Sequence, residues 1–219
     1  DEYFIDVFLK GEDIHHAVAK KVFHVDDDGV TPNMRRQAKV INFGILYGMG
    51  VNALKENLGS TRAHAEEFHK LYFEQFPKII GYLKSTEDEA EKKGYTTTLF
   101  GRRRYFPDIK SKLPYIQAQA KRMAVNAPIQ GTATADIIKL AIRDVEENLA
   151  KAGLLEDAVL LLQIHDELVY EVKDAAVDEF VKVVVPAMES VIRKEFVTGM
   201  KQVPLKVEYG IGDDLDSIK

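Results

Sequence analysis

Four side chains that could bind a charged ligand with a ring follow one another at intervals of four residues. They are Arg35, Lys39, Phe43 and Tyr47. On an α-helix each is rotated by about 40° from the one before, so the four form a slowly winding ridge about 18 Å long. Arg and Lys can bind phosphate oxygens, whereas Phe and Tyr offer flat faces to a sugar or a base. The ridge therefore matches a nucleoside triphosphate. In the alternative, the aromatic residues pack in a core and the cations are solvated.

A second group consists of two adjacent carboxylates between strand-like apolar runs. Asp166 and Glu167 follow His165 and separate the runs 159–164 and 168–172. Adjacent carboxylates repel each other unless a cation neutralises them, and hard oxygen ligands at this density suit Mg²⁺. The pair is a candidate metal site, with an ordinary solvated polar turn as the alternative.

A third group is cationic. Residues 92–122 contain nine basic residues and one acidic residue, whereas residues 141–219 contain nine basic and 17 acidic residues. The basic segment includes Arg102, Arg103 and Arg104, which stand next to aromatic residues. Such a run indicates contact with a phosphate backbone, without sequence specificity. A solvated surface is the alternative interpretation.

A second row of side chains follows this basic run. Arg122, Asn126 and Gln130 also stand four residues apart, and all three can donate to the acceptors that every base pair presents in the minor groove. We expect Pro128 to interrupt the helix that carries them, so the spacing alone does not place the three on one face.

The elements that would position these groups are mostly helices. Apolar periodicity and turn residues predict helices over 12–24, 33–48, 62–75, 78–93, 111–125, 129–151 and 175–196. A β-hairpin that turns at Gly101 is expected over 94–107, and strands are expected over 159–164, 168–172 and 205–209. The pattern predicts an α+β fold, with a helical lobe and a smaller lobe built on an antiparallel sheet.

The composition narrows the class of protein further. The chain has 219 residues, a net charge of −5 and no cysteine, which excludes disulfides and thiolate metal sites. No apolar run approaches the roughly 20 residues that cross a bilayer, and no signal-peptide pattern opens the chain. We therefore expect a cytoplasmic protein that has no membrane partner.

Three segments resemble the family A DNA polymerases, the bacterial DNA polymerase I type. RRQAKVINFGILYG, which begins at Arg35, resembles motif B, and QIHDELVY, which begins at Gln163, resembles motif C. TLFGRRR, which begins at Thr98, is also similar, and the resemblance covers essentially the whole chain. It implies a helical fingers lobe and a partial palm built on a small antiparallel sheet. Residues 1–32 would lead from palm to fingers, 33–110 would form the fingers, and 111–219 the C-terminal part of the palm.

The resemblance also implies a role for each candidate residue in DNA-directed DNA synthesis. Arg35, Lys39, Phe43 and Tyr47 would bind the incoming dNTP, with Lys39 also catalytic. Asp166 and Glu167 would be catalytic metal ligands in a site for two Mg²⁺ ions. The residues that would contact primer–template DNA are Arg102, Arg103, Arg104, Arg122, Asn126, Gln130 and His165.

Two departures from the family pattern bear on activity and on helix register. Residues 1–15 resemble the segment that comes directly after motif A, so the motif A aspartate is absent and an upstream remainder of the polymerase is an expected partner. We therefore expect this chain alone to bind nucleic acid weakly and not to polymerise. In addition, QGTATAD, which begins at Gln130, is one residue longer than the family pattern. The extra residue must rotate the rest of the helix by about 100° or be absorbed as a π-bulge.

Two other classes of function remain open at this stage. One is a module that binds nucleic acid without catalysis. The other is a metal phosphohydrolase of the HD type, which would use His15, His16 and the pair His165-Asp166. The HD type requires its His-Asp pair on a helix, so the conformation around His165 separates these alternatives.

Overall fold

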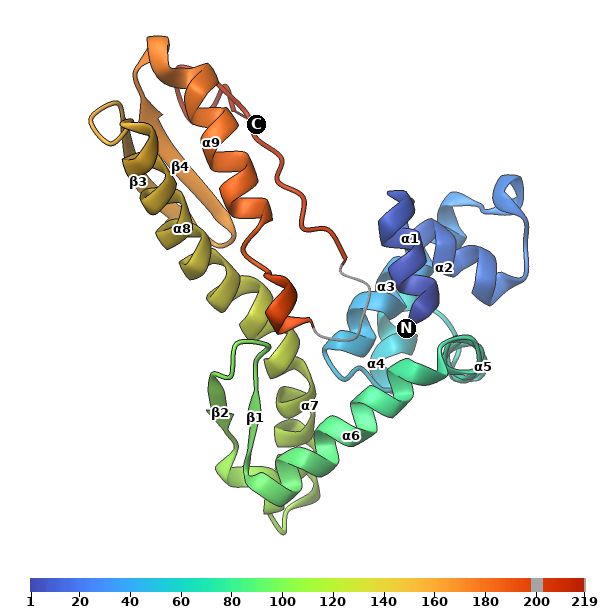
Figure 1. The fold of residues 1–219 in the computed structure, drawn as a ribbon. Helices are drawn as coiled ribbons and strands as arrows, with labels where there is room; N and C mark the ends of the chain where they lie inside the picture. The colour runs from blue at the N-terminus through green and yellow to red at the C-terminus, as the bar shows by residue number, and fades with distance from the viewer. Residues whose placement is uncertain (198–202, 219) are drawn as a thin grey trace. The chain divides into compact units, whose positions relative to one another are not determined.

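The computed structural model describes residues 1–197 and 203–218. The chain forms two compact units, Asp1–Thr132 and Ala133–Lys219, each built around its own elements (Figure 1). Helices with small antiparallel sheets make up both units, as the α+β prediction requires.

Seven helices and one hairpin of the first unit are described. The helices are α1 Glu2–Lys10, α2 Ile14–Phe23, α3 Pro32–Leu46, α4 Val51–Leu58, α5 Arg62–Gln75, α6 Pro77–Lys93 and α7 Pro114–Gly131. The hairpin consists of β1 Tyr95–Thr97 and β2 Arg103–Tyr105. The predicted helices over 12–24, 33–48, 62–75 and 78–93 are confirmed, whereas α1 and α4 were not predicted.

Helix α3 is fixed at both ends by local chemistry. Thr31 caps its N-terminus by accepting from the Met34 N–H at 3.2 Å, and Pro32 occupies the first turn, where no backbone donor is needed. The helix ends before Gly48, which has a φ of 66°. Ala38, Ile41 and Ile45 are buried and pack into the core of the first unit. This face fixes the rotation of the helix about its axis.

The expected break at Pro128 is wrong, because helix α7 runs through the proline to Gly131. Pro128 removes one backbone hydrogen bond. The buried face of α7, formed by Ala120, Ala124 and Ala127, packs with Ala90, Phe106 and Ile109. We attribute the continuity of the helix to this packing, which outweighs the lost hydrogen bond near the C-terminal end.

The extra residue of QGTATAD is absorbed as a π-helix over Thr132–Asp136. A wider turn takes up one residue without rotating the next helix by the full 100° or so of an inserted α-helical residue. The second of the two expectations for this segment is therefore confirmed.

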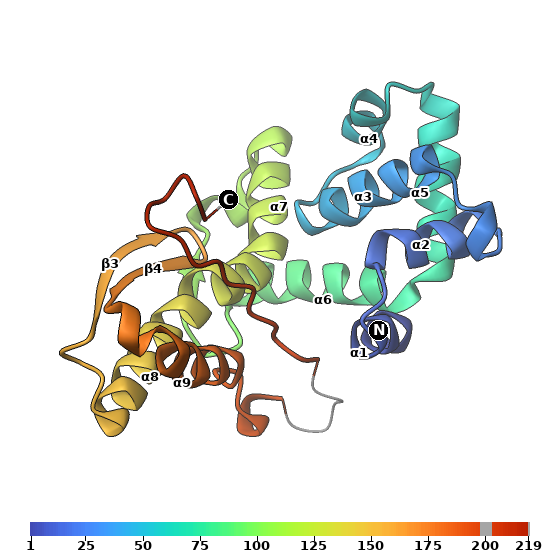
Figure 2. The same ribbon diagram turned by 90° about the horizontal axis from the view of Figure 1, so that it is seen from above.

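The second unit is a two-stranded sheet covered on one face by helices. Its elements are α8 Ile137–Ala152, β3 Ala158–Ile164, β4 Glu167–Val172 and α9 Val177–Glu189. Figures 1 and 2 both show α8 and α9 side by side along β3 and β4. Val145, Leu149 and Val184 form the core with Ala158 of the sheet.

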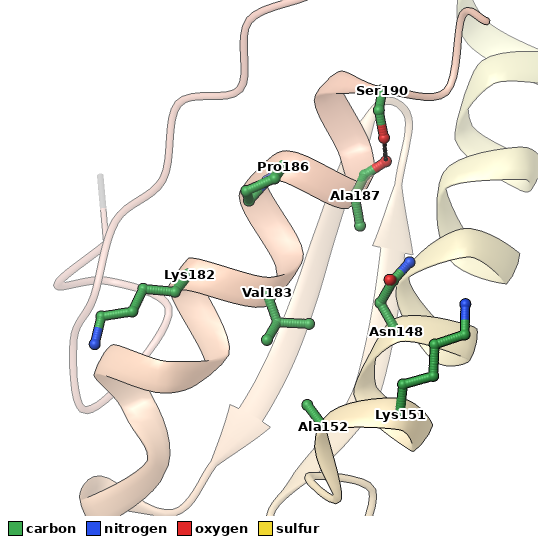
Figure 3. A pocket seen from close by; sticks show the side chains of 8 residues that line it. All are labelled: Asn148, Lys151, Ala152, Lys182, Val183, Pro186, Ala187 and Ser190. Atoms are coloured by element: carbon green, nitrogen blue, oxygen red, sulfur yellow. Dashed lines mark hydrogen bonds between the residues drawn. The ribbon is translucent and has the colours of Figure 1, made fainter.

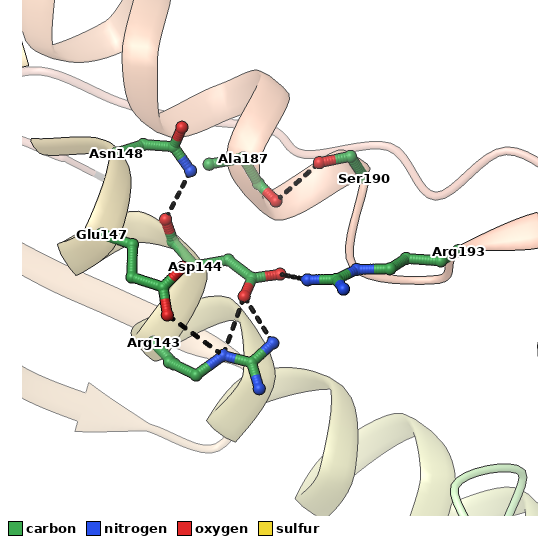
Figure 4. A network of polar contacts seen from close by, with 7 residues as sticks. All are labelled: Arg143, Asp144, Glu147, Asn148, Ala187, Ser190 and Arg193. Atoms are coloured by element: carbon green, nitrogen blue, oxygen red, sulfur yellow. Dashed lines mark hydrogen bonds and ion pairs between the residues drawn. The ribbon is translucent and has the colours of Figure 1, made fainter. Parts of the chain in front are cut away.

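A polar network joins α8 to the segment after α9 (Figure 4). Asp144 is 8% exposed and accepts from Arg143 Nε at 2.9 Å and Nη2 at 2.6 Å, while Arg193 Nη2 lies 3.7 Å from its other oxygen. Asn148 donates to the Asp144 carbonyl at 2.6 Å. The buried carboxylate is thus paired with two guanidinium groups, as a buried charge requires.

Two expectations for the last third of the chain are wrong. The helix expected over 175–196 ends at Glu189, where the Ser190 hydroxyl donates to the Ala187 carbonyl at 3.2 Å. The strand expected over 205–209 is irregular chain, because the Val207 N–H donates to the side chain of Glu189 at 3.1 Å and not to a neighbouring strand.

Candidate functional site

The ridge of four side chains lies on the exposed face of α3. Phe43 is 48% exposed and Tyr47, which comes directly after the last helical residue, is 54% exposed, while Arg35 and Lys39 are also exposed. The buried face of the same helix is already filled by Ala38, Ile41 and Ile45. The alternative in which the two aromatic residues pack in a core is therefore wrong, and their rings are free to contact a ligand.

Asp13 forms an ion pair with Arg35, at the cationic end of the ridge. Its carboxylate forms an ion pair with Arg35 at 2.5 Å and caps the N-terminus of α2 by accepting from the His16 N–H at 2.8 Å. Partial burial of the carboxyl group raises its pKa, but the hydrogen bonds from Arg35 and His16 outweigh this and hold the pKa below its ordinary value. Asp13 therefore stays ionised, and Arg35 is oriented by an acceptor that any anionic ligand would have to share.

His15 belongs to the same group, although the ridge spacing does not include it. Its Nδ1 lies 3.1 Å from Nδ2 of Asn42, and its ring lies 5.6 Å from the ring of Phe43. Burial lowers the pKa of His15, and the charges of Arg35 and Lys39 lower it further against the opposing effect of Asp13. A neutral imidazole beside two cations can accept or donate hydrogen bonds without adding charge. No spacing rule links His15 with Phe43, because they lie on different helices.

Gly48 brings the aromatic end of α3 against α7. A Cβ at Gly48 would lie 2.7 Å from Cγ and 3.1 Å from Cα of Arg122, so only a residue without a side chain fits there. The positive φ of 66° also favours glycine at this position. Tyr47 and Arg122, the ends of two different predicted rows, are thus held near each other.

The second row shares one face of α7, since the helix is continuous. Arg122 and Gln130 are exposed and Asn126 is half-buried. Of the three hairpin arginines, Arg103 lies over the ring of Tyr95 at 4.9 Å and Arg104 over the ring of Phe106 at 5.6 Å. Arg102 differs, because its Nη2 donates to the carbonyl of Gly131 at 3.0 Å.

The carboxylates lie in the second unit, at a two-residue turn between β3 and β4. Ile164 pairs with Glu167, so that His165 and Asp166 form the turn. His165 has a φ of 55°, and its carbonyl accepts from Gln163 Nε2 at 3.2 Å. All three residues, His165, Asp166 and Glu167, are exposed at the end of the ribbon. The expected tight turn is confirmed, and the HD type is disfavoured because the His-Asp pair lies in a β-turn.

By themselves, the two carboxylates are too few to form a complete metal site. Within residues 1–197 and 203–218, no group of three or more His, Asp or Glu side chains is arranged to hold a metal ion. Two exposed carboxylates nevertheless fit Mg²⁺, which takes one or two protein carboxylates and completes its shell with water and substrate phosphates. A metal ion bound there would need further ligands from a substrate or from another segment.

A pocket of about 430 Å³ between α8 and α9 is separate from these groups (Figure 3). Its wall includes Asn148, Lys151, Lys182 and Ser190, and none of the predicted site residues lines it. The helices of the described part of the chain include none with the length and apolar character to cross a membrane.

Comparison with known proteins gives these groups a context. The sequence model for DNA polymerase family A matches residues 1–217. DNA polymerase I of Bacillus caldotenax is 44% identical over 97% of this chain, and the thermostable DNA polymerase I of Thermus aquaticus is 42% identical over all of it. The chain spans about a quarter of these relatives, 23% and 25% of their lengths.

A solved structure is similar along the whole chain. The POL domain of Pol1 from M. smegmatis, in complex with DNA primer-template and dNTP, superposes with a TM-score of 0.88 and is 38% identical. The match covers 100% of this chain and 37% of that one. On the family match, the identity to its members and this likeness in fold, the chain belongs to DNA polymerase family A.

Proposed function

We propose that this chain supplies the fingers and the C-terminal part of the palm of a DNA-directed DNA polymerase. In this proposal residues 1–32 lead from palm to fingers, residues 33–110 form the fingers, and residues 111–219 belong to the palm. The observation that supports it best is the exposed ridge on α3, which places two cations and two aromatic rings on one face of a helix whose other face is buried.

The ridge binds the incoming dNTP. Arg35 and Lys39 hold the triphosphate, Phe43 lies against the sugar, and Tyr47 lies by the templating base. The exposed side chains and the neutral His15 beside them support this assignment. Lys39 has a catalytic role as well, because a cation at this position stabilises the charge that develops on the leaving pyrophosphate.

The primer–template duplex contacts α7 and the β1–β2 hairpin. Arg122, Asn126 and Gln130 donate to minor-groove acceptors near the primer terminus, where contacts test the geometry of a pair without reading its sequence. Arg103 and Arg104 contact the phosphate backbone of the template, and the sequence assigns Arg102 to the same surface. His165 lies by the primer end.

Asp166 and Glu167 hold divalent cations in the complete enzyme. Family A polymerases use such ions, and two Mg²⁺ ions would supply the charge that lowers the pKa of the primer 3′-hydroxyl and stabilises the leaving pyrophosphate. The exposed turn presents both carboxylates where a substrate can reach them. Since the described residues supply two such ligands and not three, we propose that this chain alone does not polymerise.

The central experiment is Asp166→Asn in a full-length polymerase that contains this chain. We expect kcat to fall by about 10³-fold or more, because a lost metal ligand removes several kcal/mol of transition-state stabilisation. Affinity for primer–template DNA should stay within about twofold. Asp213→Asn, at an exposed position outside the turn, is the matched control and should leave kcat unchanged.

Two results would contradict the proposal. Synthesis at an unchanged rate by the Asp166→Asn variant would reject the assigned role of the turn. Template-dependent incorporation of a dNTP by the isolated 219-residue chain would show that two carboxylates suffice.

A further inference from the structure

The tip of the β1–β2 hairpin lies beside the C-terminal end of α7 and is hydrogen-bonded to it (Figure 1). Arg102 Nη2 donates to the Gly131 carbonyl at 3.0 Å, and the Leu99 N–H donates to Oγ1 of Thr132 at 3.0 Å. The Thr132 hydroxyl in turn donates to the Pro128 carbonyl at 2.6 Å. The first two contacts form a clamp between residues 98–102 of the hairpin and residues 128–132 of the helix, and the third fixes the Thr132 side chain within it.

The clamp lies at the junction between two kinds of helix. Thr132 ends the α-helical stretch and begins the π-helix, in which backbone hydrogen bonds shift from the fourth to the fifth residue. Side-chain donors from Arg102 and Thr132 reach carbonyls at this junction. The inserted residue and the clamp thus meet at one turn of the helix.

Gly131 allows the hairpin to come this close. A Cβ at Gly131 would lie 2.9 Å from Cγ2 of Thr98 and 3.1 Å from Nη2 of Arg102. Thr98 in turn orders the hairpin tip, because its Oγ1 accepts from the Arg102 N–H at 3.1 Å. The guanidinium of Arg102 therefore contacts backbone, whereas those of Arg103 and Arg104 lie over the rings of Tyr95 and Phe106.

We propose that Arg102 is a positioning residue that fixes the end of α7, and with it Asn126 and Gln130, relative to the phosphate-binding arginines of the hairpin. This inference rests on the proposed DNA interface and changes the role of Arg102 within it. A residue that binds phosphate acts through its charge, whereas a residue that donates from a guanidinium N–H to a backbone carbonyl acts through the position of that donor.

The test compares Arg102→Lys, Arg102→Gln, Arg103→Gln and Thr132→Val in a full-length polymerase that contains this chain. One measurement is the slope of log K against log salt concentration for primer–template binding, which falls by about 0.9 for each lost phosphate contact. A second is the preference for extending matched over mismatched primer ends. A third is hydrogen exchange at residues 128–136. Thr132→Ser, which keeps the hydroxyl, is the control for Thr132→Val.

We expect both Arg102 variants to keep the salt slope, to lose about tenfold in the preference for matched ends, and to speed exchange at 128–136. Lysine keeps the charge but not the fork, so Arg102→Lys should fail as Arg102→Gln does. Thr132→Val should reproduce these effects, and combining it with Arg102→Gln should add little, because both changes open one clamp. Arg103→Gln should reduce the slope by about 0.9 and leave exchange unchanged.

A slope that falls in Arg102→Gln and returns in Arg102→Lys would overturn the positioning role, as would unchanged exchange in both variants. Failure of the proposed DNA interface looks different. In that case Arg103→Gln would leave the slope unchanged while the Arg102 variants still speed exchange at the π-helix.

Discussion

Asp13 places a carboxylate beside the residue that is proposed to hold the triphosphate. Asp13→Asn keeps the cap of α2, since asparagine caps as well as aspartate, but it removes the negative charge that pairs with Arg35. We expect a lower KM for dNTP, by a few-fold, because Arg35 no longer exchanges one anion for another. Steady-state kinetics of a full-length polymerase that contains this chain, at saturating primer–template, measure this.

The matched variant is Asp13→Ala, which also loses the cap. It should reduce the free energy of unfolding by about 0.5–2 kcal/mol, whereas Asp13→Asn should change it little. A higher KM in Asp13→Asn would mean that the ion pair prepares Arg35 for the phosphate and does not compete with it.

His15 should titrate below the ordinary pKa of 6.5, because it is partly buried and lies near Arg35 and Lys39. Its folded form therefore favours the neutral ring, and its contribution to stability is lost as the pH falls from 6.5 through the lowered value. NMR titration of the ring should show the low pKa, and Lys39→Gln should raise it. If the pKa of His15 is unchanged in Lys39→Gln, the charge of Lys39 does not act on the His15 ring.

The candidate residues of the ridge could be predicted from the sequence because they share one helix. Arg35, Lys39 and Phe43 stand at intervals that the geometry of a helix converts into one face. His15 and Asp13 reach the same place from another helix, and only the packing of α2 on α3 brings them there. Contacts of this kind leave no periodic signal in a sequence.

At the scale of elements, Gly48 sets the approach of α3 to α7. Gly48→Ala should lower the free energy of unfolding by more than the roughly 1 kcal/mol that a left-handed conformation costs a residue with a Cβ, because the methyl group also overlaps Arg122. Gly59→Ala is the control, since Gly59 has a φ of 62° but open space around it. Denaturant unfolding of the two variants measures the difference, and equal losses would contradict the close approach.

The elements that the sequence misses are those whose cause lies outside the segment. Turn residues and periodicity predict α3, and a glycine turn predicts the hairpin at Gly101. The continuity of α7 through Pro128 depends instead on packing with residues of other elements. The segment 205–209 has a strand-like sequence, but its Val207 N–H bonds to Glu189. The local sequence pattern does not show such contacts with distant residues, so it does not predict these elements.

On the scale of the whole molecule, each unit has its own buried core. We therefore expect a destabilising substitution in one unit to leave hydrogen exchange in the other unchanged. Leu149→Ala, at a position 2% exposed in the second unit, should cost about 2–5 kcal/mol. Hydrogen exchange should speed in α8, α9 and the β3–β4 sheet and stay unchanged in α3 and α5. Leu155→Ala, at a position 45% exposed, is the control. Equal acceleration throughout both units would show one cooperative structure.

The π-helix at Thr132–Asp136 gives this chain a place where its length can change. A turn that has accepted one residue can release it again, and the shorter sequence can close as ordinary α-helix. Deleting Thr134 should therefore leave a folded protein, whereas deleting Val125 from the regular part of α7 should turn everything after it by about 100° and unfold the helix packing. Circular dichroism and thermal melting of the two deletions would show whether the joint between these helices is also the point at which insertions and deletions are tolerated.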